Sequence, residues 1–62
     1  MKARRQSTAA QAGEALYEAA TNMSIAEALE NYGSAQAVAD AVVAQVGHGD
    51  PGDVLAYLEA NR

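Results

Sequence analysis

The sequence SAQAVADAVVAQVG at residues 34–47 carries the most regular helical pattern of the 62-residue chain. Its apolar side chains recur at i, i+3, i+4, i+7, i+8 and i+11, at Ala35, Val38, Ala39, Val42, Val43 and Val46. This spacing places them on one continuous face of an α-helix. Ser34 is a favoured N-cap residue, and Gly47 readily ends a helix in a left-handed conformation. We therefore predict a central helix over residues 34–46 that buries this face.

Two more helices are predicted upstream by capping boxes, in which a Ser or Thr and a Glu or Gln three residues later bond each other's backbone amides. Ser24 and Glu27 form one such pair, and Thr8 and Gln11 form the other, so the first helix begins after Ser7 or Thr8. Gly33 stands where the helix that follows Ser24 should end. These signals predict helices at 8–21 and 24–32.

Downstream, the glycine-rich sequence VGHGDPGDV at residues 46–54 predicts the start of a fourth helix. Asp50 is a suitable N-cap, and Pro51 fits the first helical position because its missing N–H is not needed there. Asp53 falls in the first turn, where the helix dipole favours a negative charge. We therefore predict a helix over residues 50–61.

The same sequence also contains potential metal ligands, because His48, Asp50 and Asp53 offer one nitrogen and two carboxylates. Their spacing matches no established ligand signature, and the chain has no second histidine and no cysteine. A phosphate site is disfavoured because the two carboxylates would repel the anion. We therefore predict no metal and no cofactor, and we interpret His48 as a solvated loop residue.

Together these segments predict an all-α fold, a compact bundle of four short helices. The helices at 8–21, 24–32, 34–46 and 50–61 form a single helical domain at 8–62, which follows a flexible basic arm at 1–7. The predicted core consists of Leu16, Met23, Ile25, Leu29, Val38, Val42, Val43, Val46, Val54, Leu55 and Leu58, with alanines filling the remaining positions. Gly13 interrupts the first helix at a cost of about 1 kcal/mol relative to alanine. A core this light leaves open a homodimer that completes it.

Charge is distributed very unevenly along the chain. The four basic residues are Lys2, Arg4, Arg5 and Arg62, so there is no Lys or Arg from residue 6 to residue 61. That segment contains all eight acidic residues: Glu14, Glu18, Glu27, Glu30, Asp40, Asp50, Asp53 and Glu59. A surface of one sign repels itself and forgoes the Lys and Arg ion pairs that mixed surfaces contain. This asymmetry requires a functional explanation.

The sequence argues against an enzyme and against a membrane protein. The hydroxyl side chains are mostly needed as helix caps, and a lone histidine has no second group to complete a nucleophile–base arrangement. No apolar segment is long enough for a secretory signal or a membrane span, and the absence of cysteine fits a reducing compartment. We therefore expect a cytoplasmic, non-enzymatic protein.

The two helices around Gly33 have the outline of a helix-turn-helix, which suggests DNA binding as one interpretation. The second helix would present Gln36, Asp40 and Gln45 to the major groove, with no Lys or Arg. Because contacts with phosphate dominate affinity for DNA, an acidic body without cations is a poor DNA ligand. We therefore do not expect direct nucleic-acid binding.

In overall character the chain resembles the small acidic helical inhibitors of phages and mobile elements, including DNA mimics and anti-CRISPR proteins. The resemblance lies in its size, its helices, and the eight carboxylates in a body without Lys or Arg. It implies a protein that binds and inhibits a nucleic-acid-binding complex by presenting anions to a basic surface. The eight acidic residues above would then make the contact.

The alternative is an adaptor, assembly or docking module that contacts a protein partner through apolar side chains. Tyr17, Tyr32 and Tyr57 are the candidate anchors, because tyrosine is enriched at interface hot spots. Each of them is also compatible with a half-buried position at the rim of the core. In this interpretation the acidic surface serves only solubility.

Overall fold

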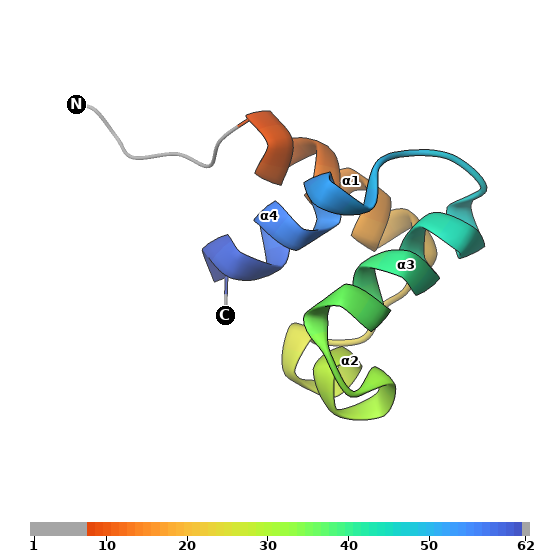
Figure 1. The fold of residues 1–62 in the computed structure, drawn as a ribbon, viewed down its shortest axis with the longest axis vertical. Coiled ribbons are helices and arrows are strands. Elements are labelled where there is room, and N and C mark those ends of the chain that lie inside the picture. The colour runs from red at the N-terminus through yellow and green to blue at the C-terminus, as the bar shows by residue number, and fades with distance from the viewer. Residues whose placement is uncertain (1–7, 62) are drawn as a thin grey trace.

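The computed structural model describes residues 8–61, which form four α-helices (Figure 1). They are α1 (Thr8–Ala20), α2 (Ile25–Tyr32), α3 (Ala35–Val46) and α4 (Pro51–Asn61). The described residues contain no strand, so the predicted all-α bundle of four short helices is confirmed. The predicted basic arm at residues 1–7 and the terminal Arg62 lie outside the described residues.

The caps of α2 and α3 follow the sequence prediction closely. The Ser24 hydroxyl accepts a hydrogen bond from the Glu27 backbone N–H at 3.1 Å, and the Glu27 carboxylate accepts one from the Ser24 N–H at 3.4 Å. Ser34 caps α3 with its own side chain. Gly33 and Gly47 end α2 and α3 in the left-handed region, at φ of 93° and 92°. Local hydrogen bonding therefore sets these helix boundaries.

The start of α1 distinguishes between the two predicted starts. α1 begins at Thr8, as expected for a start after residue 7, so Thr8 is a helical residue and not the cap that we predicted with Gln11. The position directly before Thr8, where an N-cap residue stands, lies outside the described residues.

The sequence between α3 and α4 acts as a turn and a cap. The Asp50 carboxylate accepts a hydrogen bond from the Gly52 backbone N–H at 2.9 Å, and Pro51 is the first residue of α4. Gly49 has a φ of 107°, and a Cβ built on it would lie 2.7 Å from the Leu16 methyl groups. The loop therefore packs directly on α1, and the predicted roles of Asp50 and Pro51 are confirmed.

α1 and α4 lie against each other, and their backbones approach closely at Gly13. A Cβ at Gly13 would overlap the Asp53 carbonyl and would come within 2.8 Å of the Val54 Cα. The sequence indicated only the cost of this glycine to helix α1. In the structure, the missing side chain allows the backbone of α4 to pack on that of α1.

The core buries fewer of the large apolar residues than we predicted. The buried apolar residues are Ala10, Leu16, Tyr17, Ala28, Val38, Ala39, Val42, Val54 and Leu58. The other predicted core residues, which are Met23, Ile25, Leu29, Val43, Val46 and Leu55, are half-buried and pack around this set. Leu58, Val38 and Val54 are the largest fully buried side chains, and alanines of α1, α2 and α3 fill the space around them, which lets the helices approach closely. Tyr17 is the one large addition that the sequence did not indicate.

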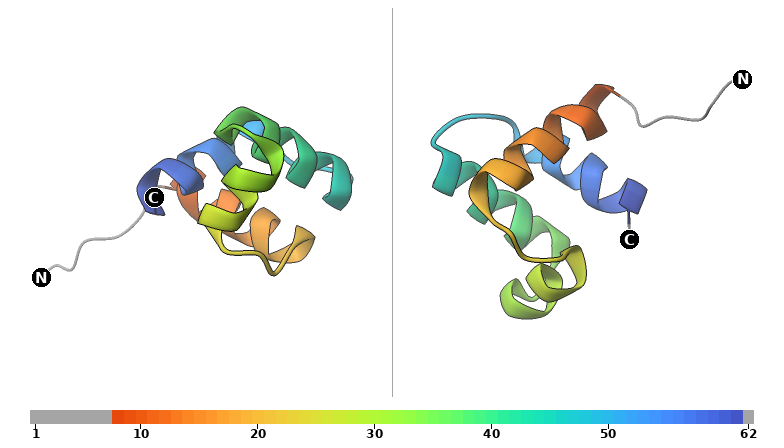
Figure 2. Two further views of the ribbon diagram at one scale, coloured as in Figure 1. Left: turned by 90° about the horizontal axis from the view of Figure 1, so that it is seen from below. Right: turned by 180° about the vertical axis from the view of Figure 1, so that it is seen from behind.

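α2 lies at one end of the long axis of the molecule, at the bottom of Figure 1 and of the right-hand view in Figure 2, and it packs mainly against α3. It is the shortest helix, and Ala28 is its only fully buried residue. None of the four described helices combines the length and apolar composition needed to cross a membrane.

Candidate functional site

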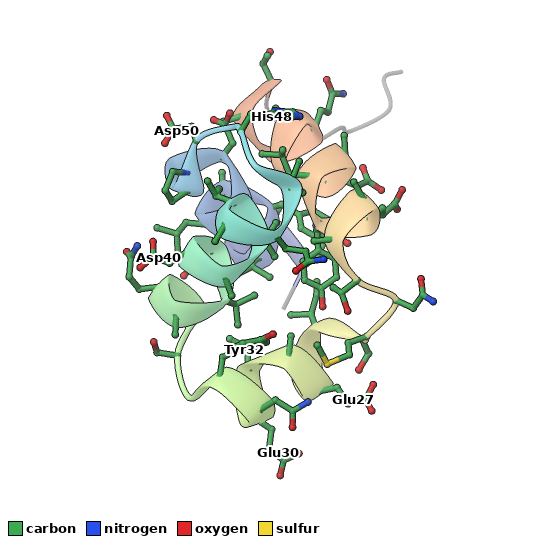
Figure 3. All side chains as sticks on the ribbon, turned by 90° about the vertical axis from the view of Figure 1, so that its right-hand side faces the viewer. Glu27, Glu30, Tyr32, Asp40, His48 and Asp50 are labelled. Atoms are coloured by element: carbon green, nitrogen blue, oxygen red, sulfur yellow. The ribbon has the colours of Figure 1, made fainter. Side chains whose placement is uncertain are left out.

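The described residues offer no grouped metal ligands. Within residues 8–61, no three His, Asp or Glu side chains lie close enough together to hold a metal ion. His48 is exposed on the loop before α4, and Asp50 beside it is committed to capping (Figure 3). The remaining candidates for a functional site are the surface carboxylates and the tyrosines.

The predicted carboxylates belong to all four helices and the loop before α4. Glu14 and Asp53 are half-buried, whereas the remaining six, Glu18, Glu27, Glu30, Asp40, Asp50 and Glu59, are exposed. In Figure 3 the labelled carboxylates of α2, α3 and the loop point outward in different directions. The structure does not gather these labelled carboxylates into one cluster.

Some of these carboxylates also have local structural contacts. Glu27 belongs to the capping box of α2, and Asp50 caps α4. Asp40 accepts a hydrogen bond at 3.0 Å from the Gln36 side-chain amide on the exposed side of α3. That side would be the recognition surface of a helix-turn-helix, and it has no Lys or Arg with which to contact phosphate.

A groove of about 370 Å³ lies between α2, α3 and the C-terminal end of α1, and we call it the tyrosine groove. It is lined by Tyr17, Ala20, Thr21, Met23, Ala28, Tyr32, Val38, Ala41, Val42, Ala44 and Gln45. We did not predict this groove from the sequence. A signal was present in α3, where Val38, Ala41, Val42 and Gln45 follow at i, i+3, i+4 and i+7 beside the central apolar face.

Tyr17 is only 4 % exposed, which corrects the expectation that it is a contact or rim residue. Its hydroxyl group lies 2.9 Å from the Met23 carbonyl oxygen and 3.1 Å from the Ser24 carbonyl oxygen, and it donates its hydrogen bond there. Burial raises the pKa of Tyr17, and the nearby Tyr57 and Glu27 raise it further. Tyr17 therefore holds the link between α1 and α2 and forms part of the groove wall.

Tyr57 on α4 is half-buried and packs against Tyr17. The two ring centroids are 5.5 Å apart, with an angle of 48° between the ring planes. Burial raises the pKa of Tyr57, with smaller contributions from the Glu14 and Glu18 carboxylates of α1. Tyr57 thus occupies the half-buried position that we gave as the alternative to a contact role.

Tyr32, the last residue of α2, is the exposed member of the three. It is 48 % exposed, and it is the large apolar side chain that the described residues leave most open to solvent. Its ring lies between α2 and α3, on the wall of the tyrosine groove (Figure 3). Of the three predicted tyrosines, Tyr32 is the most exposed to solvent.

In comparisons with known proteins, no family model matches this chain, and neither a curated protein nor a solved structure matches it. The fold and the surface define a small all-α protein with an acidic body and a tyrosine-lined groove.

Proposed function

We propose that this protein is a non-enzymatic inhibitor that binds the basic surface of a nucleic-acid-binding protein complex through its acidic body. The supporting observation is that the body carries acidic residues where helix stability favours basic ones. None of the four described helices has a basic residue in its last turn, the place where the helix dipole favours a cation. Glu18 and Glu59 instead lie near the ends of α1 and α4.

The distribution of the carboxylates suggests the shape of the partner surface. Because exposed carboxylates come from every helix, a flat basic surface would reach only some of them. A concave basic cleft, such as one that holds a nucleic acid, would reach several sides at once. We therefore propose that the protein occupies such a cleft in the cytoplasm and excludes the nucleic acid from it.

Capture from a lysate of the source cells, with immobilised wild-type protein at low and high salt, tests this proposal. The matched variants are Glu14→Lys/Glu18→Lys and Glu27→Lys/Glu30→Lys, each checked for helix content. We expect wild type to retain basic nucleic-acid-binding proteins at low salt and to release them at high salt. Both variants should fail to retain these proteins. Added duplex DNA should compete for the retained proteins. Equal retention by wild type and variants at every salt concentration, or no basic protein retained by wild type, would contradict the proposal.

A second candidate, a docking module that contacts its partner through apolar groups, is favoured by the exposure of Tyr32 at the tyrosine groove. Its binding would be lost on Tyr32→Ala and would depend little on salt. The same capture experiment, repeated with Tyr32→Ala, therefore separates the two functions.

A further inference from the structure

We propose that the tyrosine groove binds an arginine or lysine side chain carried on an apolar segment of the partner protein. This inference rests on the proposed function, because it names the part of the acidic protein that receives one basic residue of that partner. It also gives the exposed Tyr32 a role that the carboxylates alone do not explain.

The lining of the groove suits the aliphatic part of a long basic side chain. Alanines and valines of α1, α2 and α3 provide most of the wall, and none of the eleven lining residues is charged. Arginine and lysine bury their methylene groups along such surfaces while the charged end reaches a polar site. The apolar neighbours of the basic residue would lie on the alanine and valine wall, and its charged end would lie on the half-exposed ring of Tyr32.

A negative charge lies beside the wall of the groove where α2 begins. The Met23 and Ser24 carbonyl oxygens accept the hydrogen bond of the Tyr17 hydroxyl, at 2.9 and 3.1 Å, and the Ser24 oxygen also accepts from the Ala28 N–H, so these carbonyls hold the wall in place. The charge comes from the Glu27 carboxylate, which accepts from the Ser24 N–H at 3.4 Å and raises the pKa of Tyr17, a lining residue. Five residues further along α2, about 8 Å along the helix axis, Tyr32 offers an aromatic face for a cation–π contact.

Charge excludes the main competing occupants. Residues 8–61 contain no Lys or Arg, so the groove has no such cation to hold a phosphate or a carboxylate. The body of a second copy would bring eight more carboxylates to the same surface and would be repelled. The negative charge of the body instead attracts a segment that carries a basic residue.

Binding is measured by NMR on the full-length, isotope-labelled protein. The probe is a short capped peptide of alternating leucine and arginine, and its control replaces arginine with citrulline, which keeps the shape and removes the charge. We expect the arginine peptide to shift the amide resonances of Ala28, Ala41 and Ala44, which line the groove. The citrulline peptide should bind about tenfold more weakly.

Three variants locate the contact. Tyr32→Ala should weaken binding about tenfold. Ala44→Leu, which fills the groove from an exposed position, should weaken it by a similar factor and serves if Tyr32→Ala unfolds the protein. Glu27→Gln removes the charge but keeps a residue that completes the capping box, whereas Glu30→Gln removes the same charge elsewhere on α2. We expect a severalfold loss for Glu27→Gln and a much smaller one for Glu30→Gln.

Equal affinity for the arginine and citrulline peptides would overturn the inference, as would no shift of groove resonances at millimolar peptide. Free arginine amide that binds as tightly as the peptide would show a site for a small cation instead, and self-association lost on Tyr32→Ala would show that a second copy occupies the groove. In each case the lysate test of the acidic surface is unaffected. Conversely, salt-insensitive capture from the lysate would overturn the proposed function while the peptide result stands.

Discussion

α1 and α4 pack backbone against backbone at Gly13, whereas α2 meets the rest of the molecule beside the tyrosine groove. α1 buries Ala10, Gly13, Leu16 and Tyr17, but α2 buries only Ala28. The same alanine-rich composition thus gives a tightly packed region and an open one. Binding elements are commonly drawn from the less stable parts of a fold, and the groove lies in the less buried part of this one.

The largest expected effect comes from closing the tight contact, with Gly13→Ala. Helix propensity alone predicts a gain of about 1 kcal/mol in the free energy of unfolding. Because the added Cβ meets backbone atoms of Asp53 and Val54, which cannot rotate away, we expect a loss of about 1–3 kcal/mol. Urea denaturation monitored by circular dichroism shows whether the free energy of unfolding rises or falls.

The matched control is Ala12→Gly, at an exposed neighbouring position of α1. It should lose about 1 kcal/mol through propensity alone. If packing matters as described, both substitutions destabilise the protein although they are opposite changes. Stabilisation by Gly13→Ala would show that α4 does not approach α1 as closely as the structure has it.

A smaller effect is expected at the connection between the two regions, with Tyr17→Phe. The change removes the hydroxyl group that bonds the Met23 and Ser24 carbonyls and leaves the ring in the core. We expect a loss of about 1 kcal/mol in the free energy of unfolding. Tyr32→Phe, at the exposed tyrosine, should change it very little. Equal losses in the two variants would contradict a specific role for the Tyr17 hydroxyl.

The elements that the sequence predicted correctly are all set by short-range chemistry. The capping box of Ser24 and Glu27, the glycine ends of α2 and α3, and the Asp50 cap each involve residues within four positions of one another. Propensities and capping rules describe such contacts directly. Four helices and their order therefore follow from the sequence.

The features that the sequence missed depend on how the helices cross. From the sequence, Gly13 is only a residue that weakens a helix, but in the structure α4 packs against it. Tyr17 is compatible with a rim position from the sequence, but in the structure its hydroxyl bonds carbonyls six and seven residues away. The tyrosine groove requires the relative positions of three helices. No local pattern specifies these long-range contacts.

Alkaline pH should weaken the packing between Tyr17 and Tyr57. The pKa of both side chains is raised above the ordinary value of 10.0, so the folded state favours their neutral forms. Their contribution to the free energy of unfolding is complete below pH 10.0. It is lost as the pH rises through the raised pKa values of the folded state. Thermal unfolding at a series of alkaline pH values should show a falling melting temperature in wild type. The double variant Tyr17→Phe/Tyr57→Phe should show a shallower fall, and an unchanged slope would contradict this assignment.

The smallest expected effect is a gain, from Glu18→Lys in the last turn of α1. The substitution replaces a like-charge pair with Glu14 by an attractive one, and it places a cation where the helix dipole favours it. We expect about 0.2–0.5 kcal/mol more stability at low salt, a smaller gain for Glu18→Gln, and loss of the difference at high salt. No gain at low salt, or a gain that survives high salt, would contradict the electrostatic account. A gain here would show that wild type keeps an acid where stability favours a base, which is expected of a surface whose sign serves binding.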